Sequence, residues 1–403
     1  MKKILILISI IYLGISLPSF AEEDTGDTME ANSVENNNFD REQEVKKYRY
    51  RFSLDSNKQT AYTGADLSMS FIEAYRQIED SINPPKSLIY NILMAIPRIM
   101  VTDYVGVFQH EVFGHGARAR EFGWKITNYK VNFDGTGSTG YLLPLSSHYQ
   151  QRVAMALGGI QATEVLSYKV KESFLDSRNI NPVYGAAYIN SAGDQLFYVL
   201  NTKYNGKSHD INNYIYNMNI MYGKNYITKS KIKQRTKISF LDPFLWFSAY
   251  ALATGEDFEY PMLNIGEVGY LPGFRAIFTP YGIENELRNY VRTPKTPVQI
   301  NLSQGKHKTG TSRKVEIIVD KLFSTDKIDF GVDLAVWKQP KLLVADVIKA
   351  PNKNGYMAEA KASIKLSDVS SAYGAIGYKT SGFMMGRPLK SSTMVRVGVG
   401  FDL

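Results

Sequence analysis

The pattern of apolar and polar positions changes twice along the chain. Residues 46–55 alternate aromatic or aliphatic with charged side chains, which is typical of a strand. From 71 to 268 the apolar positions recur mostly at helical spacing, and from 269 to 403 they alternate with polar ones. The pattern therefore predicts an α+β protein, in which a helical domain follows an N-terminal strand region, residues 46–70, and precedes an antiparallel meander.

The helical region predicts one long helix and several shorter ones. The long helix is apolar, runs from Lys86 to about Phe122, and is expected to kink near Pro97. Further helices are expected near 149–176, 182–204, 208–223 and 242–254, the last opening with Asp242 as N-cap and Pro243 in its first turn. Between the first two helices, the glycine-rich residues 134–140 predict a loop or hairpin.

The C-terminal region alternates most clearly in three segments: Ile328 to Val336, Tyr356 to Ile364 and Val395 to Leu403. Strands of about ten residues that are apolar on one face are typical of outer-membrane barrels. The final strand resembles the assembly signal of barrel proteins, except that its aromatic residue, Phe401, is third from the end. We therefore expect a β-barrel of about 8–12 strands, in which strand 46–55 lies beside the last one. A soluble antiparallel sheet packed on the helices by one face is the alternative.

The long apolar helix could also be considered as a membrane span. The best candidate, Leu88 to Phe108, contains Pro97, Arg98 and Asp103. No uninterrupted apolar run after the first 21 residues reaches the ~20 residues needed to cross a bilayer. We therefore expect a buried core helix here.

The N-terminus indicates export. Residues 1–21 combine two lysines, an apolar run and the small-x-small ending Ser19-Phe20-Ala21, which is the pattern of a bacterial signal peptide. Residues 22–45 are polar and mostly acidic, and we expect a disordered lead-in. The chain has no cysteine, so no disulfide-linked partner is possible. The expected location is the bacterial cell envelope, in the outer membrane or the periplasm.

The charge of the chain is modestly basic. Lys and Arg number 47 against 39 acidic residues, but they are scattered and do not alternate with aromatics. This distribution gives no support for nucleic-acid binding, whereas an affinity for anionic lipid of the outer membrane explains it well.

The candidate chemistry lies at the end of the long helix, in the segment His110-Glu111-Val112-Phe113-Gly114-His115. A His-Glu pair followed by a second His is typical of zinc hydrolases, which usually space the two histidines four residues apart. Here they are five apart, which at about 3.6 residues per turn rotates the second ring about 140° from the first. A π-type distortion from Val112 to His115 would realign them, and Gly114 would ease it.

This segment resembles the zinc motif of the dipeptidyl peptidase III family at His110, Glu111, Gly114, His115 and Gly116. It is also similar to the motif of the microcin-processing metallopeptidases, where Glu121 would correspond to a downstream acid. The resemblance is confined to this short segment. It implies that His110 and His115 bind Zn²⁺, that Glu111 is the general base, and that a later helix supplies a third ligand.

Two acids compete as the third ligand. Glu164 is the first choice, because it stands in an otherwise apolar helix where a carboxylate is costly to bury unless it is paired or bound to a metal. Asp194 is the rival, because it resembles the aspartate that a later helix contributes in intramembrane metalloproteases. Either acid could instead be a helix-surface residue or a cap.

The remaining histidines are weaker candidates. His209 is expected to cap a helix, with polarisation of a substrate carbonyl as the less favoured role, and His148 should begin another helix. His307 is expected to lie in a lysine-rich turn and to be solvated.

The sequence thus favours a zinc-dependent hydrolase of the cell envelope, with a metallopeptidase that acts on a peptide or envelope substrate as first choice. The alternative is an outer-membrane barrel with a helical plug and non-catalytic histidines. A hydrolase of lipid or lipopolysaccharide is a third, weaker hypothesis.

Overall fold

The computed structural model of the protein describes residues 48–57, 59–82, 87–201, 209–308, 310–340 and 352–403. The expected signal peptide and acidic lead-in lie outside the described residues.

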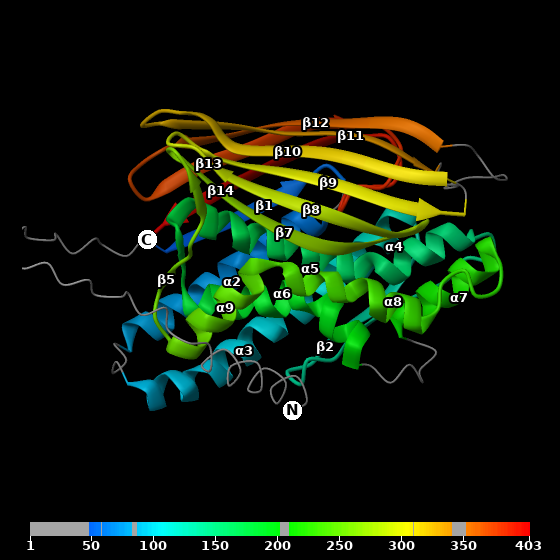
Figure 1. The fold of residues 1–403 in the computed structure, drawn as a ribbon, viewed down its shortest axis with the longest axis horizontal. Coiled ribbons are helices and arrows are strands. Elements are labelled where there is room, and N and C mark those ends of the chain that lie inside the picture. The colour runs from blue at the N-terminus through cyan, green and yellow to red at the C-terminus, as the bar shows by residue number, and fades with distance from the viewer. Residues whose placement is uncertain (1–47, 58, 83–86, 202–208, 309, 341–351) are drawn as a thin grey trace, which may run out of the picture.

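Ten antiparallel strands form one sheet, which covers one side of the molecule (Figure 1). Its order is β1-β14-β13-β12-β11-β10-β9-β8-β7-β6, so strands that follow one another from β6 to β14 are also neighbours in the sheet. The strands are β1 (Arg49–Asp55), β6 (Leu263–Ile265), β7 (Val268–Thr279), β8 (Gly282–Arg292), β9 (Pro297–His307), β10 (Gly310–Ser324), β11 (Ile328–Pro340), β12 (Asn352–Lys365), β13 (Ser370–Lys379) and β14 (Ser392–Asp402). The predicted antiparallel meander is confirmed.

The first strand pairs with the last, as the sequence predicts. Tyr50 of β1 lies opposite Phe401 of β14, and Leu54 lies opposite Val397. The prediction of a closed β-barrel was wrong, because β1 and β6 stand at the two ends of an open sheet. The alternation of side chains sets which face of a strand is apolar, but it does not determine whether the two outer strands meet.

Helices occupy the other side of the sheet (Figure 1). They are α2 (Ala61–Ser81), α3 (Leu88–His110), η1 (Glu111–His115), α4 (Gly116–Phe122), α5 (Tyr149–Ser177), α6 (Pro182–Asn201), α7 (Asp210–Tyr222), α8 (Lys229–Thr236), η2 (Lys237–Leu241) and α9 (Pro243–Thr254). The expected helices are all present, and Asp242 caps α9 by accepting from the backbone N–H of Phe244. The sequence did not predict α2 or α8. Ser, Thr and Gly are frequent in the first half of α2, and α8 is polar apart from Ile232.

The helix α5 forms the centre of the molecule, and most of its residues are buried on all sides. Helices α6 and α2 pack against it, and α3 lies on the side of the molecule opposite the sheet (Figure 1). The short hairpin of β2 (Ile126–Val131) and β3 (Gly137–Tyr141) confirms the predicted loop or hairpin and lies against η1. Strands β4 (Asn179–Ile180) and β5 (Phe258–Glu259) form a separate pair. This arrangement places the motif between α5 and the hairpin.

Candidate metal centre

The two motif histidines lie on either side of a π-helical turn. The helix α3 ends at His110 and continues without interruption through the π-helix η1, Glu111–His115, into α4. The predicted π-type distortion from Val112 to His115 is therefore confirmed. Close packing against α5 accompanies it, since a Cβ atom on Gly114 would lie only 2.5 Å from Cα of Gly159.

The two histidines converge on a single oxygen atom. Nε2 of His110 and Nε2 of His115 each lie 3.1 Å from Oδ2 of Asp210, in the first turn of α7. Glu111 lies close to the two histidines, since ligand-type atoms of His110, Glu111 and His115 lie within 4.8 Å of one another. The His110 ring can lie this close to α5 only because residue 159 is a glycine. A Cβ atom on Gly159 would lie 2.1 Å from Nε2 of His110.

The opposite nitrogen of each ring faces a hydrogen-bond acceptor. Nδ1 of His110 lies 3.2 Å from Oδ2 of Asp194, and Nδ1 of His115 lies 2.8 Å from the carbonyl oxygen of Met155. Such partners require a proton on Nδ1 of each ring, so each Nε2 either carries a second proton or offers a lone pair. The two Nε2 atoms and the Asp210 carboxylate therefore point at one another, and either a second proton on each ring or a shared cation would satisfy this arrangement.

Protons or a metal ion could satisfy these three atoms. Two ligand atoms ~2.0–2.1 Å from one tetrahedral ion are separated by about 3.3 Å, close to the distances found here. Burial raises the pKa of the Asp210 carboxyl, but the adjacent His115 and His110 rings hold it well below its usual range, so the group is a carboxylate. The donor set of two imidazoles and one carboxylate matches that of a catalytic zinc site with an open position.

Neighbouring side chains fix the orientation of the clustered groups. The hydroxyl of Thr163 on α5 donates to Oδ2 of Asp194 at 3.0 Å, so Asp194 is itself held in place. A carboxylate behind a ligating imidazole is a common feature of zinc sites and makes the ring a better ligand.

We expect Asp194→Asn to weaken zinc binding by about 10–100-fold, because the imidazole loses the charge that orients and polarises it. The measurement is competition for zinc against a chelating dye, with Asp176→Asn at the far end of α5 as a control that should bind like the wild type. Equal zinc affinity of the two variants would contradict the orienting role of Asp194.

Glu111 lies beside the converging atoms and is held by the β2–β3 hairpin. The hydroxyl of Thr139 donates to Oε2 of Glu111 at 2.7 Å and lies 3.0 Å from its backbone carbonyl. Both residues line a cavity of about 700 Å³ that also contains the two histidines and the amide side chains of Asn190, Asn213 and Asn217. A molecule in this cavity would contact Glu111 and the two histidines together.

The structure places the two proposed third ligands differently from the sequence prediction. Glu164 is not at the histidines: its oxygens accept from Arg275 at 2.5 Å and Arg288 at 2.6 Å. This corrects the first choice, because the cost of burying the carboxylate is offset by two arginines and not by a metal. Asp194 contacts the site, but through the far nitrogen of His110.

Sequence reasoning missed Asp210, the residue that completes the cluster. An acid in the first turn of a helix ordinarily interacts with the helix dipole, so its local sequence gives no sign of a ligand role. Its neighbour His209 caps α7, as expected, by accepting from the backbone N–H of Ile211 at 3.1 Å. His148 is the N-cap of α5 and so begins a helix, as expected. The prediction that His307 is solvated was wrong, because its ring is buried, with Nε2 2.7 Å from the Ser312 hydroxyl.

Comparison of the chain with models of protein families, with curated proteins and with solved structures finds no match. A proposal for the function therefore rests on the geometry of the cluster around His110 and His115.

Proposed function

We propose that the protein is a zinc-dependent hydrolase, and a peptidase as first choice. The observation that carries this proposal is the convergence of His110 Nε2, His115 Nε2 and Asp210 Oδ2 beside the carboxylate of Glu111. His110, His115 and Asp210 would hold the ion, and the signal-like N-terminus supports a location in the cell envelope.

The residues around the proposed ion suit hydrolysis. A zinc ion in this site would polarise the scissile carbonyl and lower the pKa of an attacking water toward neutrality. Glu111 would accept the proton of that water and return it to the leaving group, which is the role of a general base and then a general acid. Thr139 would keep the Glu111 carboxylate turned toward the cavity.

The walls of the cavity support a peptide substrate. Asn213 and Asn217 offer amide groups that can contact a peptide backbone, whereas Nδ2 of Asn190 already donates to the Ile99 carbonyl and the Thr102 hydroxyl. Arg152 also lines the cavity and suits a carboxylate or another anionic group of an envelope substrate.

Metal analysis of the purified chain tests the donor set. We expect one zinc ion per wild-type chain by elemental analysis, and loss of that ion in His115→Ala and in Asp210→Ala. Asp176→Ala, which removes a partly exposed acid on α5, should retain zinc. A wild-type chain that contains no transition metal and binds none when titrated with zinc would end the proposal.

A second candidate is a membrane protein whose metal site is structural. The apolar residues on the outward side of the sheet favour it. The two candidates differ in the role of Glu111, because a structural site has no need of a general base.

A further inference from the structure

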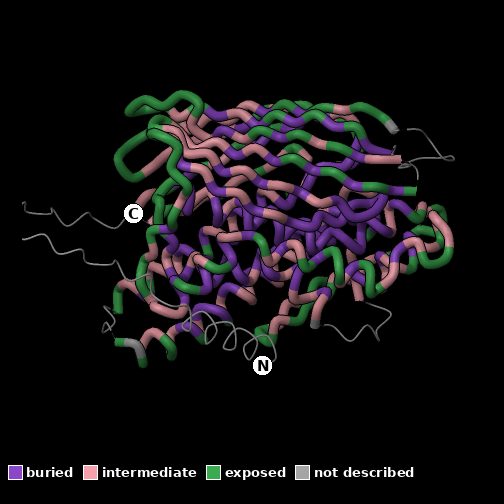
Figure 2. Tube along the Cα trace, viewed as in Figure 1, coloured by how far each residue is buried: buried purple, intermediate pink, exposed green. Residues whose placement is uncertain are grey.

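The outward face of the sheet is apolar, although it faces away from the helices. Large apolar side chains are exposed on every strand from β9 to β14 and on β1, among them Phe52, Leu302, Leu334, Val336, Ile376 and Val397. Figure 2 shows exposed positions alternating with buried ones along the strands. Soluble monomers rarely expose an apolar area that covers the face of a whole sheet.

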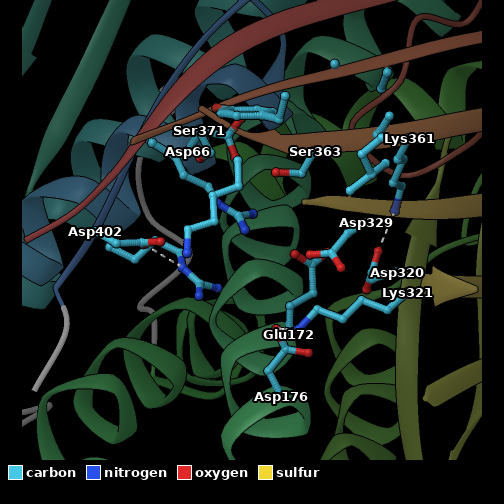
Figure 3. Close-up of a pocket in the computed structure, with 18 of the residues that line it drawn as sticks. Asp66, Glu172, Asp176, Asp320, Lys321, Asp329, Lys361, Ser363, Ser371 and Asp402 are labelled. Atoms are coloured by element: carbon cyan, nitrogen blue, oxygen red, sulfur yellow. Dashed lines mark hydrogen bonds and ion pairs between the residues drawn. The ribbon is translucent and has the colours of Figure 1, made fainter. Parts of the chain in front are cut away.

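The inward face has the opposite character. Its buried side chains include Glu286, Arg288, Asn301, Glu316, Glu359 and Arg396. At one end, a cavity of about 300 Å³ lies between α5 and the sheet. Figure 3 shows acidic and basic side chains that point into this cavity. Among them are Lys361 and Asp320, which form an ion pair at 2.9 Å. A sheet packed on a soluble core is apolar inside and polar outside, whereas the strands of membrane barrels are the reverse.

The helices hydrogen-bond to both edges of the sheet, which are β1 and, beyond the short strand β6 that pairs only with Val268–Tyr270, the rest of β7. On β1, the backbone N–H of Arg49 donates to Glu73 of α2 at 2.9 Å, and the backbone N–H of Arg51 donates to Ser70 at 2.8 Å. On β7, the backbone N–H of Ala276 donates to Ser239 at 3.1 Å, and its carbonyl accepts from Gln195 at 2.6 Å. These bonds satisfy backbone groups that an open sheet edge would leave unpaired in lipid.

The helices between the two edges also expose apolar side chains. From β1 the wall passes through α2, α3 and α9 back to β7, and each of these elements packs on the next. Exposed apolar residues on the three helices include Phe71 and Ile78, then Ile92 and Leu93, then Trp246. The stretch Ile89–Phe122 is long and apolar enough to cross a membrane, and only 33% of its most apolar window is buried in the molecule. A core helix, as expected from the sequence, would be mostly buried.

Arg98, one of the two charged residues that argued against a membrane helix, is paired inside the wall. Nε of Arg98 on α3 donates to Oε1 of Glu79 on α2 at 2.9 Å, and both side chains are buried. Charged groups at membrane depth are expected to pair and to face the protein interior.

The apolar face has the height and the borders of a bilayer. Its outward apolar positions on β11 run from Ile328 to Val336, and ~9–11 residues of a tilted strand cross the hydrocarbon core. At one border Tyr356 and Tyr378 stand side by side, with ring centroids 6.1 Å apart, followed by exposed Lys338 and Arg313. Exposed Phe residues, including Phe401, lie at the other end. Aromatic residues at both borders are typical of membrane proteins.

From these observations we propose that the protein is embedded in a lipid bilayer, with the sheet and helices α2, α3 and α9 as one continuous lipid-facing wall around α5 and α6. Lipid is the occupant that fits, because the apolar surface lies on opposite sides of the molecule. A second copy or a protein partner would cover one side only. The proposal does not depend on the metal or on hydrolysis.

Single-cysteine labelling of the full chain in vesicles of phosphatidylethanolamine and phosphatidylglycerol tests the proposal, since the natural chain has no cysteine. An environment-sensitive fluorophore is attached at Val397→Cys on β14, at Leu93→Cys on α3, or at Asp368→Cys in an exposed turn. We expect phospholipids with a spin label in the acyl chain to lower the fluorescence of the Val397→Cys and Leu93→Cys labels severalfold. The fluorescence of the Asp368→Cys label should hardly change.

Quenching at only one of Val397→Cys and Leu93→Cys, or at neither, would contradict the proposal of a continuous lipid-facing wall. A blue-shifted fluorescence without quenching by lipid would indicate a protein partner and would also overturn it. If a cysteine variant fails to fold, the wild type provides the probe, because Trp246 on α9 is 46% exposed while Trp124 and Trp337 are each 5% exposed. Phospholipids with brominated acyl chains should then quench part of the tryptophan emission. The absence of this quenching would contradict the proposal.

Discussion

The Glu111→Gln variant should lose hydrolytic activity by about 10²–10⁴-fold while it keeps its zinc. Glutamine occupies the same space and can still accept the hydrogen bond of Thr139, but it cannot take a proton from water. Activity is measured as cleavage of a quenched fluorescent peptide library or of isolated envelope material, and zinc by elemental analysis of the same samples.

A matched control is Glu172→Gln, an acid on α5 that pairs with Lys169 at 2.8 Å and lies outside the metal cluster. It should hydrolyse the substrate like the wild type. A Glu111→Gln protein that retains both zinc and full activity would exclude Glu111 as the base. A wild type with zinc but without activity on any substrate tested in parallel would favour the structural metal site.

The metal cluster could be predicted from the sequence only in part. His110, Glu111 and His115 are close in the chain, so their spacing and the helix geometry were enough to predict the π-helical turn. Asp210 lies 95 residues after His115, and no local pattern links the two. The third ligand depends on how α7 approaches η1 in the folded protein, which only the structure provides.

The fold has a similar limit. The alternation of side chains predicted the strands and the pairing of β1 with β14, because both follow from local geometry. It did not predict that α2 would hydrogen-bond to the free edge of β1, since this depends on single polar side chains such as Glu73 and Ser70. The helices therefore complete a wall that the sequence pattern assigned to strands alone.

The inward polarity of the sheet has a further consequence at Glu164. Its carboxylate accepts from Arg275 of β7 and Arg288 of β8, and all three side chains are at most 1% exposed. These ion pairs join the central helix α5 to the sheet. Replacing one member of such a group leaves the others charged and buried, which is much more costly than the loss of a surface ion pair.

We expect Glu164→Ala to lower the free energy of unfolding by about 3–5 kcal/mol, measured by urea titration in detergent micelles. The control is Glu172→Ala on the same helix, whose partly exposed pair with Lys169 should contribute less than about 1 kcal/mol. Replacing Glu164, Arg275 and Arg288 together by apolar residues of similar size should recover only part of the loss, because the buried carboxylates of Asp242 and Glu286 would then lose their arginine partners. If Glu164→Ala lowers the free energy of unfolding no more than the control does, the two arginines must be solvated in the interior. That result would contradict a tightly packed junction between α5 and the sheet.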